Sequence, residues 1–428
     1  MRIAIFYHDY GTETLDCSRP DLGNPGLGGT QYCFLMLAYF YAKKYINDTI
    51  DLFRMKRNET GSKLPISENL NIIECDSLSC FCNLCGNYDM ALLNFSFAEE
   101  ALTMIKDKTA KLIIWVHNWI RGSILKQLSD SQIVKKIVFL GQEHYERYLD
   151  DKIINKAVVI QNMYRFSGCR RNNKTHNVVF TGGLIPSKGF HYLAKSWKRI
   201  VRRVPDAKLF VVGGQRIYGG KVELGRMGLA EKSYEEYFLK FLIDSNKNLL
   251  SSVNFLGVLG IEKEEIYKNA SVGIINPTGK TEVCPLSAIE MENYFLPIVS
   301  KNTNGLPDVI KNKKTGILFK TRRGFEKSVV KLLTKDKLNE KYGLEGNYFG
   351  KKQFDPENVI LLWNELFNGV YSGKYSPCYH FTGNNGNNFK WLRKISRFIH
   401  RCPLFRNAPS LIQIEGYFAS RLRKENKK

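Results

Sequence analysis

The sequence contains no run of 18 apolar residues, so it predicts no helix that spans a membrane. Its first residues, MRIAIFYHDYG, enter an apolar strand pattern and lack the long apolar segment of a secretory leader. We therefore expect a cytoplasmic chain whose ten cysteines are reduced. A G-x-G-x-x-G fingerprint is also absent, which disfavours nicotinamide binding.

Acidic residues are scarce relative to basic ones. The 428 residues include 64 lysines and arginines against 41 aspartates and glutamates, a formal charge of +23. Such an excess predicts an anionic partner, which could be a nucleic acid, a membrane surface or a phosphorylated ligand. The excess is concentrated in Asn388–Lys428, which holds 11 basic residues and two glutamates. Hydrophobic residues at 43% and charged residues at 25% are otherwise ordinary for a globular protein.

Short apolar runs alternate with helical patterns along most of the chain. These runs are rich in Ile, Val and Phe and are mostly continuous, which is typical of parallel strands buried on both faces. The first series comprises Arg2–Tyr7, Ile50–Arg54, Asn71–Glu74, Met90–Phe95, Leu112–His117, Lys136–Leu140 and Val158–Gln161. The second comprises Val178–Gly182, Lys208–Val212, Val253–Leu256, Val272–Asn276, Pro297–Ser300 and Gly316–Phe319.

Two such series predict an α/β protein with two Rossmann-like, doubly wound domains. The polar stretch Arg165–Asn177 is the best candidate for a linker between them. We expect helices over Gly29–Lys44, Lys188–Val204, Ser287–Phe295 and Glu357–Phe367. The expected division is 1–166, 177–350, a helix within 351–375 that packs back towards the first domain, and a basic tail over 376–428, in which Thr382–Asn388 reads as a flexible spacer.

Two glycine-containing segments are candidate anion sites. In Gly26–Thr30 (GLGGT), Gly28 and Gly29 free the backbone to approach an anion, and the helix that follows offers unpaired N–H groups. In Thr181–Gly189 (TGGLIPSKG), Lys188 sits where a cation could reach a phosphate. The alternatives are an ordinary helix start in the first case and a solvated surface lysine in the second.

Two carboxylates and a histidine are further candidates. Glu282 and Glu290 lie eight residues apart, the first before a predicted helix and the second inside it. This spacing suggests two contacts along an extended ligand, with the helix N-terminus between them facing a diphosphate. His117 ends the apolar strand LIIWV, and ligands bind at the carboxyl ends of parallel strands. Ordinary surface glutamates and a hydrogen-bonded structural histidine remain as alternatives.

The cysteines and the tail carry weaker signals. Cys75, Cys80, Cys82 and Cys85 cluster, but only Cys82-x-x-Cys85 has a metal-like spacing, so whether they bind a metal stays open. In the tail, apolar residues recur at helical spacing and basic residues fill the other sides, which is typical of a membrane-surface helix. The apolar set is Trp391, Leu392, Ile395, Phe398 and Ile399, and the basic set is Lys390, Arg393, Lys394, Arg397 and Arg401. The segment Leu411–Leu422 adds a second, weaker apolar stretch before the charged end RLRKENKK. A helix that packs on the protein itself is the alternative for the tail.

Taken in order, four segments of the second half resemble a glycosyltransferase of the GT-B fold, family 4 type (glycosyl transferases group 1). They are VVFTGGLIPSKGFHYLAKSW, KLFVVGG, VNFLGVLGIEKEEIYKNASVGIINP and TEVCPLSAIEMENYFLPIVSKNTNGLPDVIKNKKTGILF. Glu282 and Glu290 match the family's E-x7-E pair. GLGGT, YDMALLNF and IIWVHNW carry a thinner resemblance in the first half.

The resemblance implies two domains facing a cleft and retaining transfer of a sugar from a nucleotide sugar. It implies that Lys188 neutralises the donor phosphates, that Glu290 binds the ribose and that Glu282 contacts the transferred sugar. It implies further that Gly28 and Gly29 close over the diphosphate and that His117 sits beside the sugar. The segment Val283–Leu286, which comprises Val283, Cys284, Pro285 and Leu286, would supply backbone N–H groups to the diphosphate or sugar.

The sequence departs from the family at two places. The family commonly has arginine where Gly183 stands, so the source of a second phosphate cation is in question. The helix of the second glutamate ends in MENYFLP, which replaces the usual small residues and suggests altered packing. No D-x-D triplet occurs, so we expect no metal and no cofactor beyond the nucleotide-sugar substrate.

We therefore expect a hexosyltransferase-type enzyme that builds a surface polysaccharide or lipopolysaccharide. Its acceptor would be a glycan or a lipid-linked acceptor, and the tail from residue 389 to 428 would hold it peripherally on the inner face of an anionic membrane. Two alternatives stay open. One is an epimerase, a phosphorylase or an inactive scaffold of the same fold, and the other is a basic nucleic-acid-binding protein, for which no recognised module is present.

Overall fold

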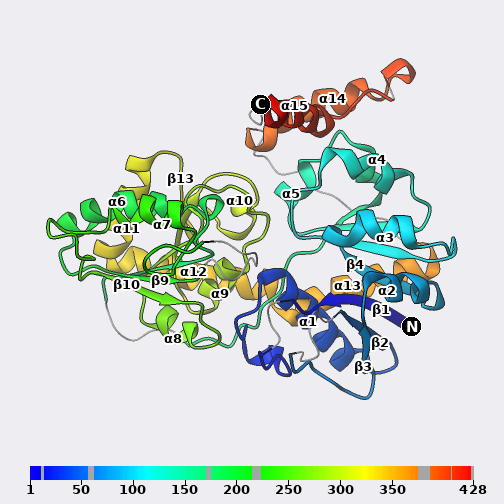
Figure 1. Cartoon of the computed structure of the whole chain (residues 1–428), viewed down its shortest axis with the longest axis horizontal. Coiled ribbons are helices and arrows are strands. Elements are labelled where there is room, and N and C mark those ends of the chain that lie inside the picture. Colours follow the sequence, from blue (N-terminus) through cyan, green and yellow to red (C-terminus); the bar gives the residue numbers. More distant parts are fainter. Residues whose placement is uncertain are drawn as a thin grey trace. The chain divides into compact units, whose positions relative to one another are not determined.

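The computed structural model describes residues 1–10, 14–55, 62–169, 175–214, 223–374, 386–405 and 407–425. Packing divides the chain into two units (Figure 1). Unit 1 comprises Met1–Tyr10, Leu37–Gln161 and Val359–Lys428, and unit 2 comprises Gly11–Met36 and Asn162–Asn358. The sequence predicts a first domain that ends at residue 166. It does not predict that residues 11–36 group with the later unit. Part of the predicted linker and most of the predicted spacer lie outside the described residues.

Unit 1 contains a seven-stranded parallel sheet of order β3-β2-β1-β4-β5-β6-β7. Its strands are β1 (Arg2–His8), β2 (Thr49–Met55), β3 (Leu70–Cys75), β4 (Met90–Asn94), β5 (Leu112–Val116), β6 (Val134–Phe139) and β7 (Ala157–Val159). Strands β4 and β5 are buried at every position, as their continuous apolar sequences predict. All seven strands predicted for this half are present.

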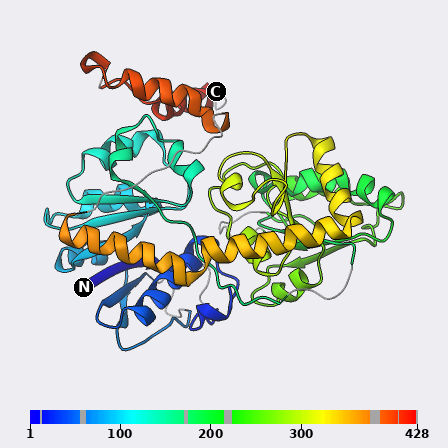
Figure 2. The same cartoon turned by 180° about the vertical axis from the view of Figure 1, so that it is seen from behind.

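The connections of unit 1 are mostly helical. They are α1 (Gly29–Lys44), which unit 2 shares, α2 (Leu78–Leu84), η2 (Cys85–Asn87), η3 (Phe95–Phe97), α3 (Ala98–Met104), α4 (Gly122–Asp130), α5 (Gln142–Glu146) and η4 (Lys152–Lys156). Helix α13 (Pro356–Ser372) also packs here, and Figure 2 shows it crossing the strands. Its Trp363 ring lies 4.7 Å from that of Trp115 on β5, edge to face. Val359, Trp363 and Leu366 are buried, so this side of α13 is a core face.

Unit 2 contains a six-stranded parallel sheet of order β10-β9-β8-β11-β12-β13. Its strands are β8 (Asn177–Thr181), β9 (Lys208–Val212), β10 (Val253–Gly257), β11 (Val272–Ile274), β12 (Ile298–Lys301) and β13 (Gly316–Phe319). Strand order reverses between β8 and β11, and the carboxyl edge at such a switch point is where doubly wound sheets bind ligands.

Helices cover both faces of this sheet, with α6 and α11 on one side and α8 on the other (Figure 1). The helical elements are η1 (Pro20–Leu22), η5 (Pro186–Lys188), α6 (Phe190–Arg203), α7 (Lys232–Leu239), α8 (Lys263–Lys268), α9 (Leu286–Asn293), α10 (Leu306–Val309), α11 (Arg322–Thr334) and α12 (Asp336–Phe354). Trp197 of α6 is fully buried among the apolar side chains of the sheet and α11. Both sheets together confirm the predicted doubly wound α/β class.

The tail forms two helices that belong to unit 1. After η7 (Asn387–Phe389) come α14 (Lys390–Ile399), η8 (Pro403–Phe405) and α15 (Leu411–Glu425). Helix α15 packs on α4, and η7 packs on α5. No helix among the described residues is long and apolar enough to cross a membrane.

The cysteine cluster of unit 1 lies at the end of β3 and in α2 and η2. The Sγ atoms of Cys75 and Cys80 are 2.8 Å apart. Burial raises the pKa of Cys82 to about 12 and that of Cys85 to about 11, which favours neutral thiols. In the part of the chain that the structure describes, no group of three or more metal-ligating side chains gathers at one point.

Candidate active site

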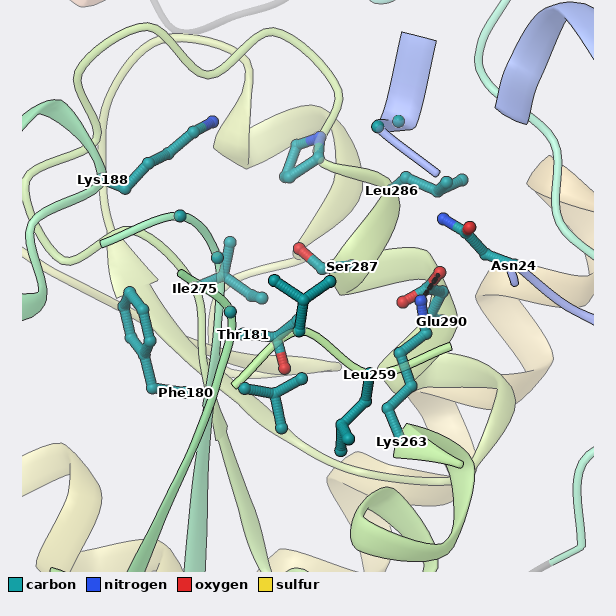
Figure 3. Close-up of a pocket in the computed structure, with 18 of the residues that line it drawn as sticks. Asn24, Phe180, Thr181, Lys188, Leu259, Lys263, Ile275, Leu286, Ser287 and Glu290 are labelled. Carbon is teal, nitrogen blue, oxygen red and sulfur yellow. Dashed lines mark hydrogen bonds and ion pairs between the residues drawn. The ribbon is translucent and has the colours of Figure 1, made fainter. Parts of the chain in front are cut away.

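A cavity of about 180 Å³ opens at the carboxyl edge of the unit 2 sheet (Figure 3). All of its walls come from unit 2, because residues 11–36 belong to this unit. The ends of β8, β9 and β11 form the floor, and the start of α9 and the glycine loop of residues 24–29 complete the wall. The lining includes Asn24, Gly28, Gly29, Thr181, Gly183, Lys188, Lys263, Asn276, Glu282, Pro285, Leu286, Ser287 and Glu290.

Glu282 stands at one end of the cavity in a polar setting. Its Oε1 accepts a hydrogen bond from Lys188 Nζ at 2.6 Å and another from Asn276 Nδ2 at 2.9 Å. Asn276 lies two residues after the end of β11, and its Oδ1 accepts from the backbone N–H of Gly279 at 3.0 Å. This side chain therefore fixes the turn that carries Glu282, and only 8% of the Glu282 side chain is exposed.

Glu290 forms a second, more deeply buried pair, and Figure 3 shows it on the opposite side of the view from Lys188. Its Oε1 accepts from Lys263 Nζ at 2.8 Å, and the two side chains are 2% and 7% exposed. The hydroxyl of Tyr267 lies 3.2 Å from Glu290 Oε2. Burial first and the nearby Glu290 charge second raise the pKa of Tyr267, so this phenol stays protonated. Lys263 and Tyr267 share one face of α8 because they are four residues apart.

Helix α9 begins between the two glutamates. Its cap residue is Pro285, and no side chain caps its first turn. Leu286 and Ser287, the first two helical residues, line the cavity. Free N–H groups and the positive end of the helix dipole therefore face this space, which favours an anionic ligand.

The predicted backbone donors do not all reach the cavity. Pro285 and Leu286 line it, whereas Val283 and Cys284 are buried behind its wall. The Cys284 carbonyl accepts from Asn162 Nδ2 at 2.9 Å, and burial raises the pKa of its thiol to about 12. Cys284 thus serves as a small, neutral residue whose backbone is held in place.

The glycine loop is shaped by Asn24. The Oδ1 atom of this buried side chain accepts from the N–H groups of Gly26 at 3.0 Å and Leu27 at 2.8 Å. Gly29, which starts α1, comes so close to α9 that an added Cβ would lie 3.8 Å from that of Leu286. Gly28 is tighter, since its Cβ would lie 3.2 Å from Gln31 Oε1.

The loop after β8 places Lys188 and Gly183 at the same cavity. Its turn ends at Gly189, whose φ of +74° strains any other residue. A Cβ at this glycine would lie 2.7 Å from Thr278 Cγ2, so the loop also packs closely on the turn after β11.

His117 belongs to unit 1, where it follows β5. Its ring lies 4.6 Å from that of Trp115 and is 8% exposed. Burial lowers the pKa of His117 to about 3, so the ring is neutral at physiological pH.

Sequence reasoning missed the part of the site that α8 supplies. Lys263 and Tyr267 stand within the segment IEKEEIYKNA, where their four-residue spacing was the available signal. Because lysine is rarely buried unless paired, only the structure could distinguish Lys263 from a surface residue. Asn24 and Asn276 were missed as well, since their side chains act on loops whose conformation the pattern does not show.

Residues 167–347 match the family model described as glycosyl transferases group 1. The chain is a glycosyltransferase, and its group 1 match lies in unit 2. The putative glycosyltransferase YtcC of Bacillus subtilis is 22% identical to it over 294 residues, which are 67% of this chain and 68% of the relative. The amylovoran biosynthesis glycosyltransferase AmsD of Erwinia amylovora is 22% identical over 246 residues, which are 55% of the glycosyltransferase described here and 63% of AmsD.

Solved structures share the GT-B fold of this glycosyltransferase. Anabaena HepE, whose crystal structure contains UDP and glucose, matches with a TM-score of 0.61 at 12% sequence identity. The match covers 86% of this chain and 100% of HepE. At this identity the likeness shows the fold, and the ligands remain those of HepE.

Proposed function

We propose that this glycosyltransferase moves a sugar from a nucleotide-sugar donor to an acceptor with retention at the anomeric carbon. The observation that carries the proposal is one cavity of unit 2 lined by Lys188, Glu282, Lys263, Glu290 and the uncapped start of α9. The E-x7-E resemblance supports retention. The residues fit an anionic, elongated ligand because cations and N–H groups alternate with the two carboxylates.

The reaction builds negative charge on the departing diphosphate and positive charge at the anomeric carbon. Lys188 and the N–H groups of α9 would stabilise the first charge, and the Glu282 carboxylate would stabilise the second. The Lys188 and Glu282 side chains are already oriented before the donor binds, because Lys188 and Asn276 donate hydrogen bonds to the Glu282 carboxylate. Such preorganisation lowers the barrier without a reorganisation cost during the reaction.

Lys263 is a second cation of the cavity in a chain that has Gly183 where the family commonly has arginine. It lies in the same cavity, but it pairs with Glu290, which the resemblance assigns to the ribose. We therefore assign Lys263 to fixing the Glu290 carboxylate and to offsetting charge at the nucleoside end of the donor. By the same resemblance, His117 would act beside the sugar in its neutral form.

The acceptor is proposed to be a glycan or a lipid-linked glycan in surface polysaccharide or lipopolysaccharide assembly. The name of the relative AmsD, an amylovoran biosynthesis glycosyltransferase, supports this class. The basic tail supports work at the inner face of an anionic membrane, because each cation near such a surface contributes about 1 kcal/mol.

The test uses Lys188→Ala and Glu282→Ala, with Lys198→Ala as the matched control on an exposed position of α6. A thermal-shift panel of nucleotide sugars first identifies the donor, since a ligand that binds only the folded state raises the melting temperature. With that donor, we expect each site variant to lose transfer by about 10²-fold or more and the control to keep it. Full transfer by either site variant would refute the assignment, and donor consumption without glycan product would favour an epimerase or a phosphorylase.

We also propose that transfer needs no metal, because fixed cations and N–H groups stand where the leaving charge develops. Transfer should then be unchanged by excess EDTA. A loss that Mg²⁺ or Mn²⁺ restores would overturn this part of the proposal alone.

A further inference from the structure

Helix α14 lies on unit 1 with its polarity reversed. Lys390 and Arg393 are fully buried, whereas Trp391 is 53% and Phe398 is 70% exposed. A surface helix ordinarily turns its apolar stripe to the core and its charges to water. Here the charges face the protein and the apolar stripe faces outward.

Four acidic side chains, of which all but Glu415 are buried, hold the two cations in place. Lys390 pairs with Glu143 at 2.7 Å and with Glu146, both on α5. Arg393 Nη1 lies 3.5 Å from Asp150 Oδ1, and its Nη2 pairs with Glu415 of α15. Removing one partner of such a pair leaves an uncompensated buried charge, so the network fixes which face of α14 points outward.

The fixation extends beyond these ion pairs. Ser396 Oγ donates to Asp150 Oδ2 at 2.9 Å, and the backbone N–H of Leu411 donates to the same oxygen at 2.7 Å. Figure 1 shows α14 and α15 beside α4 and α5, in agreement with the contacts of α15 with α4 and of η7 with α5. The tail is thus a built part of unit 1.

The exposed apolar residues of α14 recur at helical spacing on one side, and together with those of η8 we call them the tail face. It consists of Trp391, Ile395, Phe398 and Ile399 on α14 and Leu404 and Phe405 on η8, all at least 43% exposed. Lys394 and Arg401 are exposed beside it, and the sequence from Asn387 to Phe405 contains no acidic residue. An occupant of this face must therefore be apolar in part and anionic at its rim.

We propose that the tail face inserts into the interface of an anionic membrane, with its aromatic and aliphatic side chains below the headgroups and Lys394 and Arg401 among them. An interfacial helix has this composition, with tryptophan at headgroup depth. The proposal deepens the membrane placement given above and rests on it. It locates the contact on an apolar surface that buried ion pairs orient, so the inward-facing cations take no part in binding.

Brominated lipids test the insertion on the full chain. Of the five tryptophans, Trp115, Trp197 and Trp363 are fully buried, and Trp119 is partly buried. Vesicles of phosphatidylcholine and phosphatidylglycerol with brominated acyl chains should quench the fluorescence of the wild type. Trp391→Phe should abolish most of this quenching while it keeps vesicle binding within about threefold, because phenylalanine is still apolar.

Sedimentation with the same vesicles tests which residues bind. Trp391→Ser combined with Phe398→Ser should weaken binding by about tenfold or more, since two exposed apolar anchors are lost. The control combines Ile66→Ser with Tyr348→Ser, which are 77% and 69% exposed elsewhere, and it should bind like the wild type. Neither double variant changes a residue of the donor cavity.

Three results would overturn the proposal: equal binding by both double variants, no quenching of the wild type, or a dimer that the tail-face variant dissociates in the absence of lipid. The last result would assign the face to a second copy of the chain. Donor binding and transfer to a soluble acceptor are measured separately, so a failure of the sugar-transfer proposal would show in those assays and not in vesicle binding.

Discussion

Buried charge at single positions sets the strongest local constraints in this protein. Lys263 and Glu290 are 7% and 2% exposed, and each is tolerable only because the other is present. Glu292, two residues further along α9, is also fully buried. Burial raises the pKa of its carboxyl well above the ordinary 4.5, although Thr315 and Lys311 act in the opposite direction.

Lys263→Met should destabilise unit 2 by about 3–5 kcal/mol, because it leaves the Glu290 carboxylate buried without its cation. Adding Glu290→Gln should recover much of this loss, since the remaining group is neutral. Urea unfolding followed by circular dichroism measures both variants. Equal stability of the single and double variants would show that the pair is not coupled.

Glu292→Gln should stabilise the fold, and increasingly so with rising pH. The folded state keeps the Glu292 proton above pH 4.5 whereas the unfolded state releases it, so wild-type stability falls as pH rises from 4.5 towards the folded pKa. The amide has no such dependence. We expect equal stability at pH 4 and a gain of about 1–3 kcal/mol at neutral pH, measured by urea unfolding across the pH range. A gain that does not vary with pH would contradict the buried-proton account.

At the scale of elements, the sequence pattern predicted what repeats along the chain. Continuous apolar runs located all thirteen strands of the described part of the chain, and the first predicted helix, Gly29–Lys44, has the bounds of α1. The same pattern could not show that residues 11–36 pack with unit 2, because tertiary contacts decide this.

The candidate site was predictable to the extent that loops and helix starts carry motifs. Lys188, Glu282 and Glu290 line one cavity, as the motif order suggested. Lys263 was not predictable, because a buried lysine and a solvated one look alike in sequence. The direction of α14 was hidden for the same reason, since periodicity identifies two faces of a helix and not which one is buried.

Gly189→Ala tests the loop that carries Lys188, with Gly373→Ala as its control. The two glycines have φ values of +74° and +72°, so alanine meets the same backbone strain of about 1–2 kcal/mol at both. Gly373 has open space around its Cβ position, whereas at Gly189 that atom would lie 2.7 Å from Thr278. We expect only Gly189→Ala to weaken nucleotide-sugar binding in a thermal-shift assay. Equal donor affinity in both variants would show that the loop tolerates the added methyl group.

At the scale of the whole molecule, the tail is both an exterior surface and a structural component of unit 1. Its inward cations neutralise Glu143, Glu146 and Asp150, which are all at most 5% exposed. Some of the basic residues behind the +23 formal charge are thus paired inside the protein, which weakens the case for nucleic acid as the anionic partner.

Deletion of residues 386–428 should therefore lower the thermal stability of unit 1, because it exposes these acids without their partners and uncovers α4 and α5. Substituting the three outward residues Trp391, Ile395 and Phe398 by serine should leave the melting temperature nearly unchanged. Differential scanning calorimetry of both forms without lipid makes the comparison. If the deletion melts like the full chain, the ion pairs contribute no net stability.

The buried acids that pair with α14 also mean that this segment cannot be expected to bind membranes when it is isolated from unit 1. On another protein, the same residues would lack carboxylates that pair with Lys390 and Arg393. In water the helix would then turn its aromatic side chains towards the host protein and away from the solvent. The sequence of α14 alone would therefore not transfer the membrane affinity to another protein. A fusion protein intended to bind membranes through this segment would also need the surface of α5 that receives α14. A purification tag placed close to α14 would compete for that surface.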